Sequence, residues 1–334
     1  MTGTYRATML PRAGGPDVLE VVELPVTGPG PGQMRVRVTA CGVGATDLIV
    51  LAGKYSYAPK IPLVPGYEIA GVVDAIGDGV TGFTTGQRVA ALTVYGGFGE
   101  LQVREAEHFL SVPDGISDVQ VAGVVLNYVT AWQMIHRVAK VQAGQTALVT
   151  GAAGGVGTAA LQLLHLAGVK TYGAASLGKH ALVKKLGAIP IDYKAGRIDR
   201  LTRALEPRGV DYVFDAIGGA NIPLCTGAAK RGGMVVGYGF MGALNTLAIM
   251  GMFWNILIGA RLRGRLGTFY GITRLYRKDP KPLREDLPKI LALVVAGKID
   301  PLVTVTLPLL EARQALTLLA SGTVQGKIVL INPS

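Results

Sequence analysis

The segment 147–168, "ALVTGAAGGVGTAALQLLHLAG", constrains the fold more than any other part of the chain. It reads as a buried strand, a tight Gly/Ala turn and a helix, the order that places a pyrophosphate against a helix N-terminus. In this pattern Gly154 permits a close backbone approach to the ligand and Gly157 permits close packing of the helix on the strand. The segment therefore predicts a dinucleotide site, with a purely structural turn as the alternative. The candidate ligand-binding residues of the turn are Ala152, Gly154, Gly155, Val156 and Gly157.

The residues after this turn bear on which dinucleotide binds. An NAD site usually places an acidic side chain on the ribose diol about 20 residues downstream, at the end of the next strand. Residues 119–191 contain no Asp or Glu. The second strand ends instead in "ASLGKH", where Ser176 and Lys179 offer a hydroxyl and a cation suited to a 2′-phosphate. We therefore expect NADPH, with a solvated helix face as the alternative for Lys179.

A chain of 334 residues is expected to form two domains, because single cores stop growing at roughly 250–300 residues. Residues 5–110 read as short extended runs separated by Gly/Pro clusters, which favours a partly open β-barrel. From about residue 123, strand and helix signals alternate, which is typical of a doubly wound α/β domain with a parallel sheet. We place the barrel domain at 1–122 and 275–334 and the cofactor domain at 123–274. The strand candidates of the cofactor domain are 147–151, 171–176, 189–193, 211–218 and 233–239.

The composition suits a compact α/β enzyme, since 49% of the residues are apolar and only 16% are charged. Two distant cysteines exclude a secreted disulfide framework, and "MTGTYRATML" lacks the apolar core of a signal peptide, so we expect a cytoplasmic protein. The formal charge is +11, with basic clusters at 261–265 and 274–286. No nucleic-acid-binding module accompanies these clusters, and phosphate-bearing cofactors or substrates explain the charge more simply.

An apolar segment, 244–265, ends in a cluster of arginines. A membrane-spanning helix needs about 20 mostly apolar residues, and Asn255 and several glycines count against one here. We expect no membrane span and interpret 244–260 as a buried or interface helix.

Five motifs together resemble the medium-chain dehydrogenase/reductase superfamily, and specifically its zinc-free quinone oxidoreductase branch, the zeta-crystallin-like proteins. They are "ACGVGATD", "VPGYEIAGVV", "LNYVTAW", "AAGGVG" and "GKIVL", and the likeness covers nearly the full chain. The resemblance implies a GroES-like barrel domain beside a Rossmann NADPH domain, and a homodimer. It also implies that the apolar helix forms a dimer edge or roofs the substrate cleft.

The zinc-dependent members of this family carry a catalytic Cys three residues before the Asp of the first motif and a His in the G-H-E of the second. This chain has Gly44 and Tyr67 at those positions. Cys41 lies too early to serve as the ligand, and Glu68 alone cannot hold a metal that needs three protein ligands. We therefore expect no bound metal, and we interpret Cys41 as a small buried side chain.

Without a Lewis acid, the remaining chemistry is hydride transfer from NADPH to an activated acceptor, namely a small hydrophobic quinone or an α,β-unsaturated carbonyl. The resemblance places the nicotinamide in the crevice between the domains. A proton must come from a side chain or from water, and Tyr128 with Asn127 ranks first, ahead of Tyr67 and Tyr55. Each tyrosine has the alternative of a packed aromatic with its hydroxyl bonded elsewhere.

Related quinone reductases often carry Asn at the Gly44 position and Tyr where this chain has Ile49, so the substrate does not transfer simply. The resemblance places Gly239 and Phe240 beside the cofactor and Lys327 near its phosphates, with a surface lysine as the equal alternative for Lys327. Two other functions stay open. One is a biosynthetic enoyl reductase acting on a polyketide-like or carrier-bound intermediate, and the other is a non-catalytic NADPH-binding protein at a membrane surface or on a partner.

Overall fold

The computed structural model describes residues 3–240 and 246–332, which form two compact units. The first unit contains residues 1–129 and 276–334, and the second contains residues 130–275. The first boundary lies later than the predicted 122, because helix α2 (Asp118–Val124) packs on strands β3 (Gln33–Val43) and β4 (Glu68–Ile76) of the first unit.

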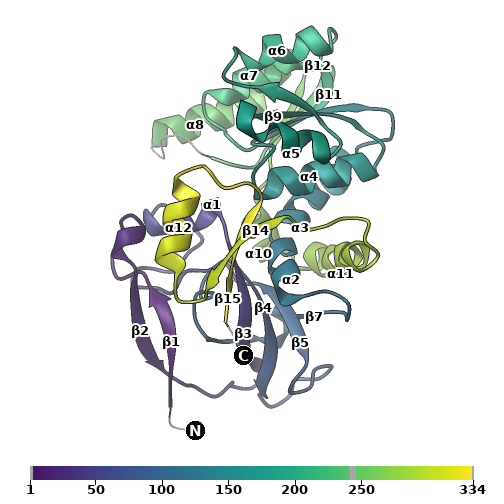
Figure 1. The fold of residues 1–334 in the computed structure, drawn as a ribbon. Coiled ribbons are helices and arrows are strands. Elements are labelled where there is room, and N and C mark those ends of the chain that lie inside the picture. The colour runs from purple at the N-terminus through teal and green to yellow at the C-terminus, as the bar shows by residue number, and fades with distance from the viewer. Residues whose placement is uncertain (1–2, 241–245, 333–334) are drawn as a thin grey trace. The chain divides into compact units, whose positions relative to one another are not determined.

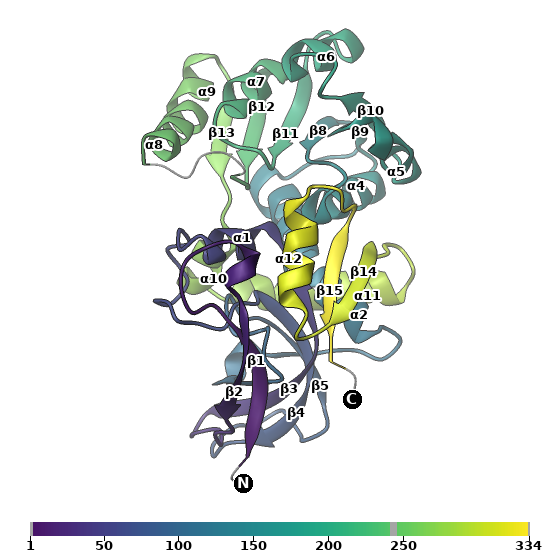
Figure 2. The same cartoon turned by 60° about the vertical axis from the view of Figure 1, so that its left-hand side comes forward.

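Two sheets make up the first unit, an antiparallel pair of strands and a larger mixed sheet in which only β14 and β15 pair in parallel among the described strands (Figures 1 and 2). Strands β1 (Thr4–Met9) and β2 (Glu20–Pro25) form a hairpin-like pair. The larger sheet has the order β14-β15-β3-β4-β5-β7, with β6 on β3, and it is not closed into a complete barrel. Its other strands are β5 (Arg88–Leu92), β6 (Leu101–Glu105), β7 (Leu110–Ser111), β14 (Val303–Pro308) and β15 (Lys327–Ile331). The architecture is the predicted partly open, GroES-like one.

Helices cover the edges and ends of this sheet. Helix α12 (Ala312–Ala320) buries Ala312, Ala315 and Leu316, the apolar stripe that its sequence predicts, and it packs beside α1 (Ala45–Leu51). The remaining helices that begin or end in this unit are α3 (Asn127–Trp132), α10 (Ile272–Lys278), α11 (Lys281–Val295) and the 3₁₀ turns η1 (Pro16–Val18) and η2 (Ala106–His108).

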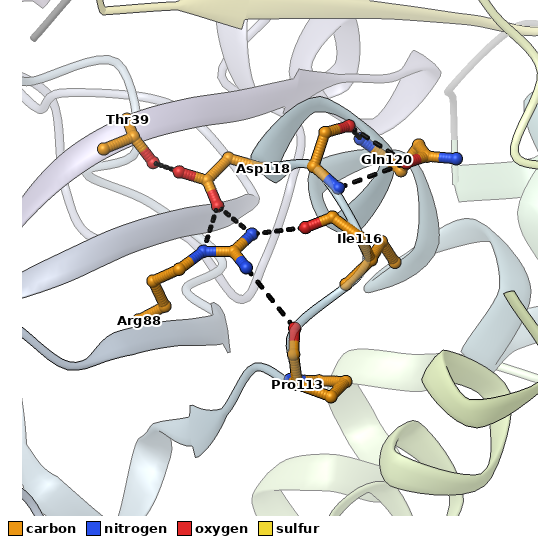
Figure 3. Close-up of polar contacts among 7 residues, drawn as sticks. Thr39, Arg88, Pro113, Ile116, Asp118 and Gln120 are labelled. Carbon is orange, nitrogen blue, oxygen red and sulfur yellow. Dashed lines mark hydrogen bonds and ion pairs between the residues drawn. The ribbon is translucent and has the colours of Figure 1, made fainter. Parts of the chain in front are cut away.

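A charged anchor fixes the start of α2 on the sheet (Figure 3). Arg88 of β5 donates to Asp118 Oδ1 through Nε at 3.0 Å and Nη2 at 2.6 Å, and Thr39 Oγ1 donates to Asp118 Oδ2 at 2.6 Å. Ser117 caps the helix by accepting from the Gln120 N–H, while Gln120 Oε1 accepts from the Ser117 N–H. The anchor sets the direction of α2, which leads into the segment that contacts the buried site described below.

The second unit is a six-stranded parallel sheet in the order β10-β9-β8-β11-β12-β13, with helices α4, α5, α6 and α7 between its strands. All five predicted strands occur, as β8 (Thr146–Thr150), β9 (Lys170–Ala175), β10 (Ile189–Asp192), β11 (Val210–Asp215) and β12 (Ala229–Gly237). The helices are α4 (Gly155–Leu166), α5 (His180–Lys185), α6 (Ile198–Leu205) and α7 (Asn221–Ala228), with the π-helical segment η3 (Gln133–Ala139) before β8 and the 3₁₀ turn η4 (Leu177–Lys179) before α5. The predicted doubly wound class is confirmed, and β13 (Leu266–Phe269) is an additional edge strand that the sequence analysis missed because it is short and follows a run of arginines.

The apolar segment forms α8 (Thr246–Trp254), the π-helical segment η5 (Asn255–Gly259) and the short α9 (Ala260–Leu262). Residues 244 and 245 of the predicted helix lie outside the described residues. Ile256 and Met252 are buried in the core of the unit, whereas Leu247 is 81% and Trp254 59% exposed. Among the described residues, no helix combines the length and apolarity that crossing a membrane requires.

Candidate functional site

The turn between β8 and α4 depends on two glycines. Gly151 has a φ of +62°, in the left-handed region that favours glycine, and the buried Ala152 follows it. A Cβ on Gly157 would lie 2.2 Å from the Gly151 carbonyl oxygen, so only glycine lets the first turn of α4 approach this closely. The predicted role of Gly157 in helix–strand packing is confirmed. The positive φ of the turn belongs to Gly151, one residue before Ala152, the first of the predicted ligand-binding residues.

The N-terminus of α4 is open to an anion. Gly154 is the N-cap residue, and no side chain caps the helix. The first N–H groups of a helix have no intrahelical partner, and they carry the positive end of its dipole. Gly155 and Val156, which begin the helix, are partly exposed. These residues fit the pyrophosphate of a dinucleotide.

The end of β9 brings Ser176 and Lys179 into one turn. The Lys179 N–H donates to the Ser176 carbonyl at 2.8 Å, closing η4. The Lys179 side chain is only partly exposed, and burial lowers the pKa of its ammonium. An adjacent phosphate would offset this effect, because an anion favours the charged form. The turn brings together the two residues predicted to bind a 2′-phosphate, and that role stays a prediction.

Asp215 organises the carboxyl ends of β8, β11 and β12. It accepts from Thr150 Oγ1 at 2.6 Å, from the Gly218 N–H at 2.7 Å and from Asn221 Nδ2 at 2.6 Å. The Tyr238 N–H donates to the Asp215 carbonyl at 2.9 Å. The sequence analysis placed Asp215 inside the strand candidate 211–218 and did not single it out. Its signal is a carboxylate that directly ends a buried strand.

Gly239 and Phe240 follow β12 at this same edge of the sheet. A Cβ on Gly239 would lie 2.0 Å from the Ala216 carbonyl oxygen, so the two strand ends touch through their backbones. The Phe240 ring packs against Gly218, whose φ is +70°. Both residues lie at the carboxyl end of the parallel sheet, where doubly wound folds bind ligands.

In the first unit, Lys327 and Glu68 form a buried ion pair. Lys327 Nζ contacts Glu68 Oε1, and the two residues are 4% and 0% exposed. Glu68 Oε2 accepts from the Leu126 N–H at 2.5 Å. Burial raises the pKa of Glu68, although Lys327 acts in the opposite direction. The alternative of a surface lysine is wrong for Lys327, because the residue lies at the start of β15, inside the sheet, and its charge is matched by a buried carboxylate.

Gly42 makes this pair possible. A Cβ at residue 42 would lie 2.3 Å from Glu68 Oε1 and 2.7 Å from Lys327 Cε. Any larger residue would therefore displace one of the two charged groups. Cys41, the neighbour of Gly42, is fully buried and unpaired, and burial raises the pKa of its thiol. The interpretation of Cys41 as a small core side chain is confirmed.

Asp47 lies in the same buried region. Its Oδ2 accepts from the Gly44 N–H at 2.8 Å, whereas Oδ1 is buried and has no hydrogen-bond partner. Burial raises the pKa of Asp47 to about 7, against the Gly44 hydrogen bond and the Lys327 charge, which lower it. A carboxyl group with this pKa changes its protonation state near neutral pH.

Tyr55 and Tyr67 form a hydroxyl pair beside this region. Their hydroxyl oxygens are 2.5 Å apart, Tyr67 is 1% exposed, and Tyr55 is partly exposed. Burial raises the pKa of Tyr67, and the Tyr55 contact and the Asp47 charge act in the same direction. The structure therefore brings together two of the four predicted catalytic residues.

The other two predicted catalytic residues are packed differently. Tyr128 is 1% exposed, and its hydroxyl donates to the Asp300 carbonyl at 3.0 Å. Asn127 begins α3 and is 5% exposed. Tyr128 is therefore a packed aromatic with its hydroxyl bonded elsewhere, the alternative to a catalytic role. The hydroxyl pair of Tyr55 and Tyr67 is the better candidate for the proton source.

The side chains at the family's catalytic metal position do not fit a metal. A Cβ on Gly44 would lie 3.8 Å from Lys327 Nζ, so a buried ammonium lies next to the place where a ligand side chain would begin. Glu68 is engaged by that ammonium, and Tyr67 by Tyr55. In residues 3–240 and 246–332, no group of three His, Cys, Asp or Glu is placed to hold a metal ion.

Comparisons with known proteins agree with this architecture. Residues 30–141 match the alcohol dehydrogenase GroES-like domain, and residues 186–330 match the zinc-binding dehydrogenase family. The quinone oxidoreductase-like protein 2 homologue of Nematostella vectensis is 30% identical over 332 residues, which cover 98% of this chain and 89% of that protein. The crystal structure of Escherichia coli quinone oxidoreductase complexed with NADPH has a TM-score of 0.88 at 26% identity, covering 98% and 99% of the two chains.

The human synaptic vesicle membrane protein VAT-1 homologue is 35% identical over 260 residues, or 75% of this chain. The chain spans 66% of the length of that protein, and 64% of its rat and mouse counterparts. The full-length match, the barrel and Rossmann units and the substituted metal positions lead to one assignment. The chain belongs to the medium-chain dehydrogenase/reductase superfamily, in its zinc-free quinone oxidoreductase branch.

Proposed function

We propose that the protein is an NADPH-dependent reductase that transfers hydride to a quinone or an α,β-unsaturated carbonyl without a metal ion. The observation that carries the proposal is the glycine-closed turn at α4, where Gly157 packs on the Gly151 carbonyl. The similarity to the Escherichia coli quinone oxidoreductase that was solved with NADPH supports it.

The second unit would hold the cofactor. The backbone N–H groups of Gly155 and Val156 would bind the pyrophosphate, and Ser176 and Lys179 would bind the 2′-phosphate. Asp215 would act indirectly, because its hydrogen bonds to Thr150, Gly218 and Asn221 fix the strand ends on which the cofactor rests. When bound, NADPH supplies a hydride.

The first unit would supply the proton. Reduction of a quinone or an enone adds one hydride and one proton, and the proton must come from a group that holds it at working pH. The raised pKa of Tyr67 keeps that hydroxyl protonated and hydrogen-bonded to Tyr55. Tyr55, which is partly exposed, would donate its proton to the reduced acceptor and recover one from water. The neighbouring pair of Lys327 and Glu68 would keep this region rigid and electrically balanced.

The test is a panel of quinones and enones with NADPH or NADH, followed through the nicotinamide absorbance, for the wild type and for Lys179→Ala. Loss of one charge-assisted contact, worth about 1.4 kcal/mol or more, should raise the KM for NADPH at least about tenfold and leave the KM for NADH unchanged. Lys184→Ala is the matched control, because Lys184 is an exposed lysine on the adjacent helix α5.

Two results would contradict the proposal. If the wild type binds NADPH but oxidises it with none of the acceptors, the protein is not a reductase of this class. If Lys179→Ala and Lys184→Ala leave the NADPH preference equally unchanged, the 2′-phosphate assignment to Lys179 is wrong.

A further inference from the structure

The second unit carries a large basic pocket at the amino ends of its strands. The pocket has a volume of about 970 Å³ and adjoins the first residues of β8, β11 and β12, including Thr146 and Asp211. The cofactor candidates lie at the carboxyl ends of the same strands. A strand of five residues spans roughly 16 Å, so the two places are separate sites on opposite edges of one sheet. The cations that line the basic pocket are Arg203, Arg208, Lys230, Arg231 and Arg265.

Two of these guanidinium groups are held in place by the backbone. Arg203 donates to the Gly227 carbonyl through Nε at 2.7 Å and to the Ala229 carbonyl through Nη2 at 3.0 Å. Arg265 donates through Nε to the same Ala229 carbonyl at 3.2 Å. Both side chains therefore converge on one carbonyl oxygen. Arg203 also donates through Nη1 to the Pro207 carbonyl at 3.1 Å, and Arg265 donates through Nη1 to the Arg263 carbonyl. A guanidinium has five N–H donors, so each still keeps at least two for a ligand.

The acidic residues of the basic pocket do not neutralise this charge. Asp211 is engaged by Lys230 and accepts from the N–H and the hydroxyl of Thr146 at 2.9 Å and 2.8 Å. Glu206 faces Lys170 at 3.2 Å and Tyr172 at 3.1 Å. Arg203, Arg231 and Arg265 have no carboxylate partner among the ion pairs of the described residues.

The arginines also repel one another. Arg231 is exposed, and its guanidinium lies over Gly264, the residue before Arg265. Burial lowers the pKa of Arg265, and the charges of Arg203, Arg231 and Arg263 lower it further. Like charges gathered in a concave site stabilise a bound anion, because the anion relieves their repulsion.

We propose that the basic pocket binds a phosphate-bearing ligand, at a site distinct from the nicotinamide cofactor site. Guanidinium groups match phosphate oxygens in paired hydrogen bonds, and three of them reach the pocket from different elements: α6, the start of β12 and the segment before β13. This arrangement suits more than one phosphate group. The pocket volume lies within the range of small-molecule sites, about 300–1,000 Å³. The phosphates belong either to a soluble polyphosphorylated molecule or to a phosphorylated lipid headgroup.

The experiment measures binding of inorganic triphosphate by calorimetry, and of phosphatidylcholine vesicles with and without a phosphoinositide by co-sedimentation. The variants are Arg231→Gln and the double variant Arg231→Gln with Arg265→Gln. Arg200→Gln is the matched control, since Arg200 is an exposed arginine on α6 outside the pocket. Loss of each guanidinium should weaken binding about tenfold, and the control should stay within about twofold of the wild type. Arg231 has no backbone hydrogen bond to lose, so its single variant should unfold at the same urea concentration as the wild type.

The two arms separate the sources of the phosphate. A soluble ligand is supported if the pocket variants weaken triphosphate binding and saturating NADPH does not prevent it. Binding only to phosphoinositide vesicles, with the same sensitivity to the variants, supports a headgroup. The proposal is overturned if neither probe binds, if Arg200→Gln weakens binding as much as Arg231→Gln, or if NADPH displaces triphosphate completely. If NADPH does not bind at all, the proposed function is contradicted, but the triphosphate result still tests the basic pocket.

Discussion

Asp47 should make the stability of the protein depend on pH in an unusual direction. Most carboxylates in folded proteins have lowered pKa values and add stability as the pH rises. Asp47 is fully buried with one oxygen unpartnered, and burial raises its pKa to about 7 from the ordinary 3.8. Between these two pH values, the folded protein holds a proton that the unfolded chain has already released. The free energy of unfolding therefore falls as the pH rises from about 4 to about 7, and this loss is complete above that range.

The interval between the two pKa values sets the magnitude. Each pH unit corresponds to about 1.4 kcal/mol, so the ionisation of Asp47 removes about 4 kcal/mol between pH 3.8 and about 7. Asp47→Asn keeps a side-chain oxygen that can accept from the Gly44 N–H and cannot ionise. Near pH 4 the free energy of unfolding of the variant should be equal to or lower than that of the wild type. As the pH rises, it should increase steadily relative to the wild-type value. The difference between the two proteins should change by about 4 kcal/mol across the interval.

Urea unfolding followed by far-ultraviolet circular dichroism, repeated at several pH values between about 3.5 and 8, measures this difference. Titrating groups that do not interact with Asp47 are common to both proteins and cancel in the subtraction. Asp114→Asn is the matched control, because Asp114 is exposed on the same unit, and it should stay within about 0.5 kcal/mol of the wild type throughout. A difference between wild type and Asp47→Asn that does not change with pH, or that moves in favour of the wild type as the pH rises, refutes the reasoning.

Three further predictions concern single contacts. Lys327→Met should lower the free energy of unfolding by about 3–5 kcal/mol, because it leaves Glu68 as a buried unpaired carboxylate. The double variant Lys327→Met with Glu68→Gln should recover part of that loss in the same urea assay. Gly157→Ala should lose NADPH binding in a fluorescence titration and unfold about 1–3 kcal/mol more easily, since its Cβ meets the Gly151 carbonyl. Its control is Gly251→Ala in α8, which should bind normally because no atom lies within 4 Å of the new Cβ. Tyr55→Phe should lower kcat about 100-fold or more with an unchanged KM for NADPH, and equal rates for Tyr55→Phe and wild type would show that water is the proton donor.

The parallel sheet and the cofactor turn were predictable because their signals are local. A buried strand, a glycine turn and an apolar helix follow one another directly in 147–168, and the five strands in this unit alternate with helices at short intervals. The misassigned detail is also local. The predicted ligand-binding residues of the turn begin at Ala152, whereas the residue with the positive φ is Gly151, one position earlier.

The buried polar site was not predictable in the same way. Glu68 and Lys327 lie 259 positions apart, and no periodicity or spacing joins them. A lysine before a closing strand has the same local sequence whether it is solvated or buried, so only the pairing of β15 with β3 places it beside Glu68. The Tyr128 hydroxyl illustrates the same limit, because its partner is a backbone carbonyl in a distant segment, at Asp300.

Three charged or titratable groups meet in the buried region around Gly44. Glu68 and Asp47 are both buried carboxyl groups, and Lys327 is the ammonium beside them. One ammonium balances one carboxylate, so the three groups together are electrically neutral when Asp47 holds its proton. The raised pKa of Asp47 extends this neutral state toward pH 7. The ammonium lies next to Gly44, where a ligand side chain would begin in the zinc-dependent relatives. Restoring Cys at Gly44 and His at Tyr67 would therefore place a divalent cation against Lys327, and charge repulsion would oppose binding until Lys327 is replaced as well.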